Sequence, residues 1–535
     1  MALQVSQFAR RAVALALPAV LAVWAGYGFE TGSVAGLPFA IPAATHLKIY
    51  QSLQKHYELG HPTFLLGQVR SQGWWYYFPI AFVLKTPLPI LIGAAYGLCR
   101  WVYLALRQRR AKPRATLLLT QHPSEPATLA FYIFPIAYAA TSLFSTVNLG
   151  YRHLLPLLPF VIIGVAGSWR GSHRTRPAGR VRSAGRVAQV SLLLWLIWGT
   201  LAVAPDYLAF FNEIAGGPAG GYRALVDSNL DWGQNLWQLR DWMTEHAVDA
   251  VFYAHYSPAN PEAYGIQANF LPPDPRAGAF TPWQPAPGFY AIGATVLQGP
   301  YAPDPNFYAW FRSREPVARL GHALWIYEVT PDAPFTYAVL CAEAGLSPEQ
   351  VRANLGQPVL RILQPDCSTA EVYAQGPGIN IVTTASSRGA QPEFTLRAPD
   401  GADSIRIYRI ETTPTPTHPY PIMTNGPLDF LGYDIVATGT TTKLHTYWRV
   451  TKRPDRLLSL MAHLVAADGT PLAIGDGMGF PIDQWNKNDI IVQQHLFHIT
   501  SNTNQTFHIG GYWLDTMERW LSEKGKDYWR IETAN

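Results

Sequence analysis

Apolar segments separated by arginine-rich segments occupy residues 1–205, and this pattern constrains the fold more than any other feature. Each apolar segment approaches the ~20 residues that a helix needs to span a bilayer. We therefore predict a multi-pass α-helical membrane domain at 1–205 with about five helices, at 11–29, 86–106, 127–147, 153–169 and 188–205. No small-residue cleavage site follows the first segment, which we interpret as a retained helix and not as a signal peptide.

The positions of lysine and arginine predict how these helices are oriented, because short loops rich in these residues stay in the cytoplasm. One group follows the second helix and another follows the fourth: Arg107, Arg109, Arg110, Lys112 and Arg114, then Arg170, Arg174, Arg176, Arg180, Arg182 and Arg186. Arg10 and Arg11 precede the first helix. We expect a protein of the cell (cytoplasmic) membrane, with 30–85, the turn at 148–152 and everything after about 206 outside the cytoplasm.

The composition agrees with a membrane location and gives no sign of a nucleic-acid partner. Charged residues make up 14% of the chain, against roughly 25% in soluble domains. The net charge is +5. Because the arginine excess lies in two short loops, we predict no binding to nucleic acid.

Three further regions are expected after the membrane domain. Short apolar runs and one helical pattern predict an extracytoplasmic α/β domain at 206–330, with Asp231 as a helix N-cap. A small helical insert is expected at 331–375, and strand patterns with a hairpin signal predict a β-sandwich at 376–535. Cys341 and Cys367 either form a disulfide outside the cytoplasm or remain free thiols.

Other polar and aromatic residues give weaker signals. Asp227, Asn229 and Asp231 have the alternate spacing of a calcium loop, but Trp232 and Gln238 stand where that loop needs Gly and Glu. We therefore predict capping or loop hydrogen bonds there and no metal site. Three tryptophans of the sandwich are candidates either for sugar stacking or for core packing: Trp448, Trp485 and Trp513.

Two stretches expected on the outer side, 61–89 and 148–160, hold the strongest candidates for a binding site. Arg152 and His153 would lie where a lipid phosphate lies, and an arginine offers phosphate a bidentate fork. Lys85, Arg70 and His61 are further candidates, and each of these cations has a simpler alternative role as an interfacial anchor. The aromatic residues are either an interface belt or a contact surface for acceptor or sugar: Trp74, Trp75, Tyr76 and Tyr77.

These stretches, together with 228–243 and 315–329, resemble glycosyltransferase family 39, the dolichyl-phosphate-mannose–protein mannosyltransferase-like family. The resemblance covers roughly residues 10–330. It implies a membrane glycosyltransferase of GT-C type that passes a sugar from a polyprenyl phosphate to an acceptor outside the cytoplasm. It also implies that Arg152, His153, Lys85 and Arg70 bind the donor phosphate.

The chain departs from that family in its first outward loop. The family has a catalytic acidic pair there, whereas residues 30–60 contain only the separated Glu30 and Glu58. The predicted helices are also fewer than the family usually has. We therefore expect the chain to correspond to the C-terminal half of the enzyme, with its catalytic residues unassigned. Three explanations are open: a separate N-terminal-half polypeptide is a partner, the start site is miscalled, or the protein is a degenerate remnant.

Two functions follow from the sequence. The first is membrane glycosyltransferase, or its C-terminal half, with membrane lipid, a lipid-linked sugar and a glycan or protein acceptor as partners. The alternative is a catalytically inactive, membrane-anchored glycan-binding or partner subunit. No cofactor is implied beyond the polyprenyl-phosphate sugar that serves as donor substrate.

Overall fold

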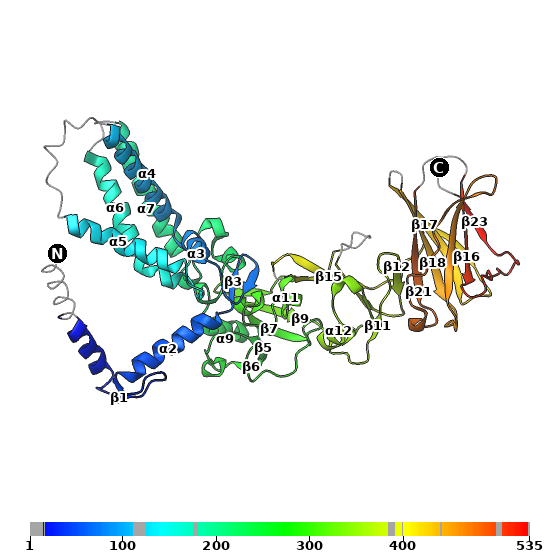
Figure 1. Ribbon diagram of the computed structural model, residues 1–535, viewed down its shortest axis with the longest axis horizontal. Coiled ribbons are helices and arrows are strands. Elements are labelled where there is room, and N and C mark those ends of the chain that lie inside the picture. Colours follow the sequence, from blue (N-terminus) through cyan, green and yellow to red (C-terminus); the bar gives the residue numbers. More distant parts are fainter. Residues whose placement is uncertain are drawn as a thin grey trace. The chain divides into compact units, whose positions relative to one another are not determined.

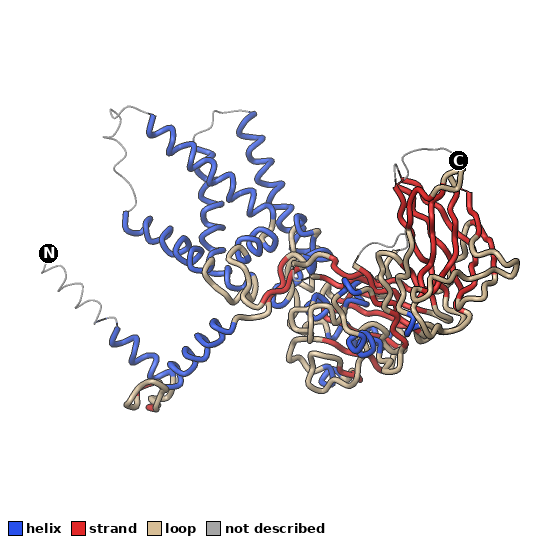
Figure 2. Tube along the Cα trace, turned by 45° about the vertical axis from the view of Figure 1, so that its right-hand side comes forward, coloured by secondary structure: helices blue, strands red, loops and turns tan. Residues whose placement is uncertain are grey.

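The structure, a computed structural model, describes residues 14, 16–110, 125–174, 180–383, 391–398, 400–438, 441–498 and 505–532 (Figure 1). It forms two compact units, residues 1–232 with 321–323 and residues 233–320 with 324–535. Figure 2 shows that helices dominate the first unit and strands dominate the second. Arg10, Arg11, Lys112, Arg114 and Arg176, which contributed to the predicted orientation, lie outside the described residues.

The first unit contains the long helices and two short hairpins. Its helices are α2 (Ala44–Leu59), α3 (Tyr77–Lys85), α4 (Leu88–Arg110), α5 (Glu125–Ser142), α6 (Leu158–Arg174), α7 (Arg180–Leu201) and α8 (Gly217–Gly220). Its 3-10 turns are η2 (Tyr151–Leu157), η3 (Tyr207–Ala209), η4 (Glu213–Ala215), η5 (Gly221–Arg223) and η6 (Asp227–Asn229). The hairpins pair β1 (Thr31–Gly32) with β2 (Ile41–Pro42) and β3 (Thr63–Leu65) with β4 (Gln68–Arg70).

The prediction of a five-helix, multi-pass membrane domain is wrong. Among the described residues, two helical segments are long and apolar enough to cross a membrane, Tyr151–Trp169 and Ala184–Leu201. A third counts only if Tyr77–Lys85 and Leu88–Leu104, which meet at a bend of 113°, form one span. The described residues also build six β-sheets, which a multi-pass helical membrane domain does not explain.

Two of the predicted helices have described apolar parts that are too short to span a membrane, and a third begins directly after a bend. The helix within 11–29 has a described apolar part of only Ala16–Gly26, and that within 127–147 has only Ile133–Ser142. The run 86–106 begins at the bend, where Thr86 has an extended backbone (φ −88°, ψ 132°) because it precedes Pro87. Hydropathy measures how apolar a segment is but does not place such breaks.

The N-terminal part of the second unit contains two five-stranded sheets with helices beside them. The first has the order β6-β5-β7-β9-β8, and the second has the order β11-β10-β13-β15-β14. The strands are β5 (Ala250–Ala254), β6 (Gln267–Phe270), β7 (Gly288–Gly293), β8 (Ala318–Leu320), β9 (Leu324–Val329), β10 (Tyr337–Leu340), β11 (Arg361–Leu363), β13 (Gly378–Val382), β14 (Phe394–Arg397) and β15 (Asp403–Ile410). The helices are α9 (Leu236–Glu245), α10 (Ala294–Gln298), α11 (Ala309–Arg312) and α12 (Pro348–Leu355), and the 3-10 turns are η7 (Pro261–Tyr264) and η8 (Ala342–Ala344).

These elements differ in detail from the predicted pattern. The stretch 331–375, expected to be a small helical insert, contains α12 but also provides β10, β11 and β12 (Ala370–Tyr373). Helix α9 begins at Leu236 after Asn235, so Asp231 does not cap it. The α12 helix does show the expected type of start, because Ser347 and Gln350 form a capping box.

The C-terminal part contains two sheets that share one core, so the prediction of a β-sandwich is confirmed in its general form. The sheets have the orders β12-β21-β18-β17-β16 and β20-β19-β22-β23. The strands are β12 (Ala370–Tyr373), β16 (His418–Ile422), β17 (Leu428–Thr438), β18 (Thr441–Val450), β19 (Leu458–Val465), β20 (Pro471–Ile474), β21 (Ile490–His498), β22 (Thr506–Trp513) and β23 (Trp529–Glu532), with the 3-10 turn η9 (Ile482–Gln484). Trp448 and Trp485 are fully buried in this core, which rules out sugar stacking on them, and Trp513 packs at its margin.

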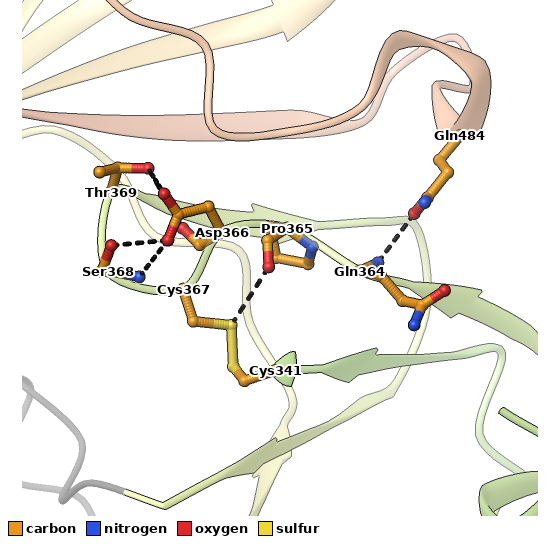
Figure 3. The surroundings of a disulfide bond; sticks show 8 residues. All are labelled: Cys341, Gln364, Pro365, Asp366, Cys367, Ser368, Thr369 and Gln484. Atoms are coloured by element: carbon orange, nitrogen blue, oxygen red, sulfur yellow. Dashed lines mark hydrogen bonds between the residues drawn. A yellow bond between two sulfur atoms is a disulfide. The ribbon is translucent and has the colours of Figure 1, made fainter. Parts of the chain in front are cut away.

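A disulfide joins Cys341, which directly follows β10, to Cys367 in the loop before β12 (Figure 3). The same loop is ordered by Asp366, whose carboxylate accepts hydrogen bonds from the backbone N and the hydroxyl of Ser368, at 3.0 and 2.6 Å. Gln484 Oε1 accepts a hydrogen bond of 2.8 Å from the backbone N of Gln364. The loop is therefore attached both to the sheet that contains β10 and to the sandwich.

Candidate functional site

Three segments that are distant in sequence meet in the first unit, and two of them carry candidate site residues. Asn229 Oδ1 accepts a hydrogen bond of 2.8 Å from the backbone N of Tyr151, and its Nδ2 donates one of 2.8 Å to Tyr77 Oη. Gly150 has φ +121°, and a Cβ atom there would lie 2.7 Å from Ser228 Oγ. The turn at 148–153 can therefore sit against 227–229 only with glycine at position 150.

Lys85 holds the same region together from the end of α3. Its Nζ donates to the backbone oxygens of Leu208, at 2.8 Å, and Asn229, at 2.5 Å, and lies 4.4 Å from the centre of the Phe211 ring. The residue is only 7% exposed. A buried ammonium needs such partners because leaving water is costly for a charge. These contacts give Lys85 a structural role, whereas the sequence suggested that it binds phosphate.

Asn212 satisfies the backbone oxygens that are left free where α3 ends. Its Nδ2 donates to the oxygens of Val83, at 2.5 Å, and Thr86, at 2.8 Å, while its backbone N donates to that of Leu84 at 2.9 Å. The last carbonyls of a helix have no partner within the helix. The bend before α4 is thus stabilised by specific hydrogen bonds, and it fixes where α3 lies.

Arg152 and His153 occupy the surface of this framework, at the start of η2. Arg152 is exposed, and its guanidinium carbon lies 5.2 Å from the centre of the Trp232 ring. The His153 ring lies 6.1 Å from the ring of Phe78, and the backbone oxygen of His153 accepts a hydrogen bond of 2.8 Å from Tyr138 Oη. His153 Nε2 is buried and has no hydrogen-bond partner among the described residues.

An apolar cavity of about 440 Å³ adjoins His153. It is lined by residues of α3, α5, η2 and α6, among them Phe78, Ile136, Ala139, Leu154 and Leu157. Phe78 both lines the cavity and contacts the His153 ring, and Leu154 directly follows His153. The ring of His153 therefore lies next to a residue of the cavity wall.

The predicted aromatic group is divided between interior and surface. Trp74 and Tyr77 are buried, whereas Trp75 is 68% exposed and forms an edge-to-face pair with Tyr76 at a centroid distance of 5.4 Å. Arg70, at the end of β4, is exposed and lies over the Trp74 ring at 5.1 Å. Of this group, Tyr77 accepts a hydrogen bond from Asn229, and the backbone N of Trp74 donates one of 2.7 Å to Asn148 Oδ1.

Asp227 lies in the turn that meets Gly150, and it has an unusual backbone conformation. Its φ of +62° is uncommon for a residue other than glycine. Such backbone conformations gather at functional sites. Its carboxylate accepts a hydrogen bond of 2.5 Å from the backbone N of Ser228, in the turn that meets Gly150. The sequence predicted capping or loop hydrogen bonds for Asp227, Asn229 and Asp231, and the bond to Ser228 is such a loop hydrogen bond.

One group of side chains in the described part of the chain has the residue types that bind metal ions. Cys341, Glu343 and Cys367 have ligand atoms within 4.8 Å of one another. Both sulfur atoms are joined in the disulfide, so neither is a thiolate that binds a metal ion.

Comparisons of this chain with protein-family models, with curated proteins and with solved structures found no match. The resemblance to glycosyltransferase family 39 therefore stays a prediction, and the function is argued from the residues of the site.

Proposed function

We propose that the chain attaches to a membrane and binds a polyprenyl-phosphate-linked sugar at the first unit, as a membrane glycosyltransferase or as one part of it. In this proposal the donor and acceptor meet on the extracytoplasmic side. The observation that carries the proposal is the apolar cavity of about 440 Å³, whose wall residue Phe78 contacts the ring of His153.

The cavity suits the polyprenyl part of such a donor. Its lining is almost wholly hydrocarbon, with Phe78, Ile136 and Leu157 among its walls. Ligand pockets of this kind take up apolar groups and use a few polar groups to set orientation. In this proposal Arg152 and His153 hold the charged head of the donor while its apolar chain occupies the cavity.

Arg152 suits the phosphate. The Trp232 ring lies beside its guanidinium, and Arg152 forms no ion pair among the described residues. The N–H edge of a guanidinium matches two phosphate oxygens. His153 Nε2 offers a second contact, because it is buried without a partner.

We assign the acid–base role to Asp227. In the transfer, the acceptor hydroxyl attacks the anomeric carbon, the bond from that carbon to the phosphate oxygen breaks, and the polyprenyl phosphate leaves with the electron pair. The hydroxyl proton passes to a carboxylate. Asp227 is half-buried, has the strained φ of +62°, and belongs to the turn that packs against Gly150.

The proposal is tested with the full chain in lipid nanodiscs and a photoreactive undecaprenyl phosphate. Arg152→Ala and Ala139→Phe are each expected to lower crosslinking about tenfold, the first by removing a charge-assisted contact and the second by filling the cavity. Arg223→Ala is the matched control, because Arg223 is also exposed and lies 5.4 Å from an aromatic ring centre, that of Tyr222.

Competition separates specific binding from attraction to a charged surface. Unlabelled undecaprenyl phosphate should compete, and phosphatidylglycerol at the same concentration should not. Equal competition by both lipids, or equal loss in Arg152→Ala and Arg223→Ala, would show that Arg152 is a general interfacial anchor. Asp227→Asn keeps a side chain that tolerates positive φ, and it should abolish sugar transfer while leaving crosslinking unchanged.

A further inference from the structure

A cleft of about 880 Å³ lies along one side of the β-sandwich, between β16 and the segment 522–530. β16 is the edge strand of one sheet and β23 is the edge strand of the other, so the cleft follows the open side of the sandwich. We propose that it binds a carbohydrate chain that bears acidic substituents. The cleft belongs to the second unit alone, and the proposal does not depend on lipid binding by the first.

The walls of the cleft are fixed by hydrogen bonds. Asn425 and Leu521 form a reciprocal pair, in which the backbone N of Asn425 donates to Leu521 O at 3.0 Å and the backbone N of Leu521 donates to Asn425 Oδ1 at 2.8 Å. The turn that follows is closed by bonds of 2.8 Å from Gly525 N to Ser522 O and from Ser522 N to Lys526 O. A site whose walls are ordered before binding loses less entropy when a ligand arrives.

Tyr420 supplies an aromatic surface. It lies in β16 and is 45% exposed. Its ring meets that of Phe430 edge-to-face, at 6.5 Å between centroids. Sugar rings present faces of C–H groups that pack on aromatic rings, so an exposed ring beside a polar cleft is suited to them. Tyr528 also lines the cleft, and its stacking on His508 at 4.3 Å holds its ring in place.

The charged residues of the cleft indicate an acidic ligand. Lys524, Lys526 and Arg530 line it, and neither lysine forms an ion pair within the described residues. Cations without internal partners are available to the carboxylate or sulfate groups of a ligand. Glu523 and Asp527 lie among them and can accept hydrogen bonds from sugar hydroxyls.

Two other classes of ligand fit less well. A peptide that added to β16 as a further strand would need backbone N–H groups there, and Pro419 and Pro421 have none. A nucleic acid would bring a phosphate with every nucleotide close to Glu523 and Asp527. A carbohydrate with spaced acidic groups matches the mixture of charges.

Binding is measured with the full chain in nanodiscs. The probes are tetragalacturonate, a sulfated chondroitin tetrasaccharide, maltotetraose as the neutral sugar and a single-stranded oligothymidylate. Tyr420→Ala removes the aromatic surface, and Lys524→Gln with Lys526→Gln removes two charges. The matched controls are Tyr264→Ala, a residue that is 41% exposed elsewhere in the second unit, and Lys452→Gln with Lys487→Gln, two exposed lysines of the sandwich.

The expected result is that at least one acidic tetrasaccharide binds more tightly than maltotetraose and the oligothymidylate. Tyr420→Ala should weaken this binding about fivefold, as the loss of one aromatic contact predicts. The double lysine variant should lose more affinity at low salt than at high salt, because salt screens the charges. The controls should bind as the unsubstituted chain does. The proposal is overturned if neither acidic probe binds, if a neutral or nucleic-acid probe binds as tightly, or if the cleft variants behave as the controls do.

Discussion

Lys85 Nζ donates a hydrogen bond of 2.5 Å to the backbone oxygen of Asn229, which lies 144 residues further along the chain. Asn229 in turn binds the backbone N of Tyr151 and the hydroxyl of Tyr77. A single buried ammonium therefore helps to place the turn that carries Arg152 and His153. Its removal should affect both the stability of the first unit and the geometry of the proposed donor site.

Lys85→Met tests this relationship. Methionine has a similar length but cannot donate hydrogen bonds, so the buried oxygens of Leu208 and Asn229 lose one donor each. We expect a loss of about 2–4 kcal/mol in the free energy of unfolding, since an unsatisfied buried polar group costs about 1–3 kcal/mol. Thermal unfolding in detergent measures the change, and Lys48→Met, at an exposed position in α2, is the control. An unchanged midpoint in Lys85→Met would show that the ammonium does not support the turn.

Gly150→Ala tests the contact between the two turns. The new Cβ would lie 2.7 Å from Ser228 Oγ and 3.1 Å from Asn229 Oδ1, at a φ of +121° that alanine rarely adopts. We expect destabilisation by more than about 1 kcal/mol and loss of crosslinking to undecaprenyl phosphate. Gly164→Ala in α6 is the comparison, because no atom lies within 4 Å of its added Cβ. If both variants bind the lipid equally well, the close approach of the two turns has no role in binding.

The sequence indicated local features of this fold more reliably than long-range ones. The predicted helices at 153–169 and 188–205 overlap the two segments long enough to cross a membrane, because each is a continuous apolar run. Alternating patterns also indicated the sandwich strands. The helix predicted at 86–106 coincides with α4, but the bend before it was not predicted, because Asn212, more than a hundred positions away, stabilises the end of α3.

The candidate site was only partly predictable for the same reason. Arg152 and His153 stood out as cations beside an apolar run, but the Trp232 ring beside Arg152 and the cavity beside His153 depend on packing between distant segments. Lys85 was assigned to phosphate because sequence does not show that backbone oxygens surround its ammonium. The division of 74–77 into buried and exposed rings likewise depends on tertiary packing.

The stability of the sandwich should depend on pH through His495. Burial lowers the pKa of His495 to about 4. Its Nδ1 lies 2.6 Å from Gly475 O, and its Nε2 lies 2.9 Å from Thr446 Oγ1. An unfolded histidine has a pKa of about 6.5, so below that value the unfolded chain binds a proton that the folded chain does not. The contribution to stability is complete above pH 6.5 and is lost as pH falls toward 4.

Lowering the pH from 7.5 to 5 should reduce the free energy of unfolding of the sandwich by about 2 kcal/mol through this histidine. Unfolding by guanidinium, followed by the fluorescence of buried tryptophans such as Trp448, measures the difference. His495→Gln removes the titration, and its stability should change less over the same range. Asp476 opposes the effect of burial on His495, whereas His445 adds to it. Equal pH dependence in the two proteins would assign the effect to groups other than His495.

The disulfide between Cys341 and Cys367 should stabilise the second unit by closing a loop across a sequence separation of 26 residues. In the chain-entropy account, a loop of this length adds about 3.5 kcal/mol to the free energy of unfolding, because the crosslink restricts the unfolded chain. Cys341→Ser with Cys367→Ser should lower the denaturation midpoint of the second unit, and a reducing agent should have no further effect on that variant. Cys99→Ser, which replaces the exposed free cysteine, should leave both the midpoint and its response to reduction unchanged. If reduction leaves the midpoint of the unsubstituted chain unaltered, the closed loop contributes nothing to stability. In that case the Gln364–Gln484 hydrogen bond and the turn at Asp366 are sufficient to hold the segment.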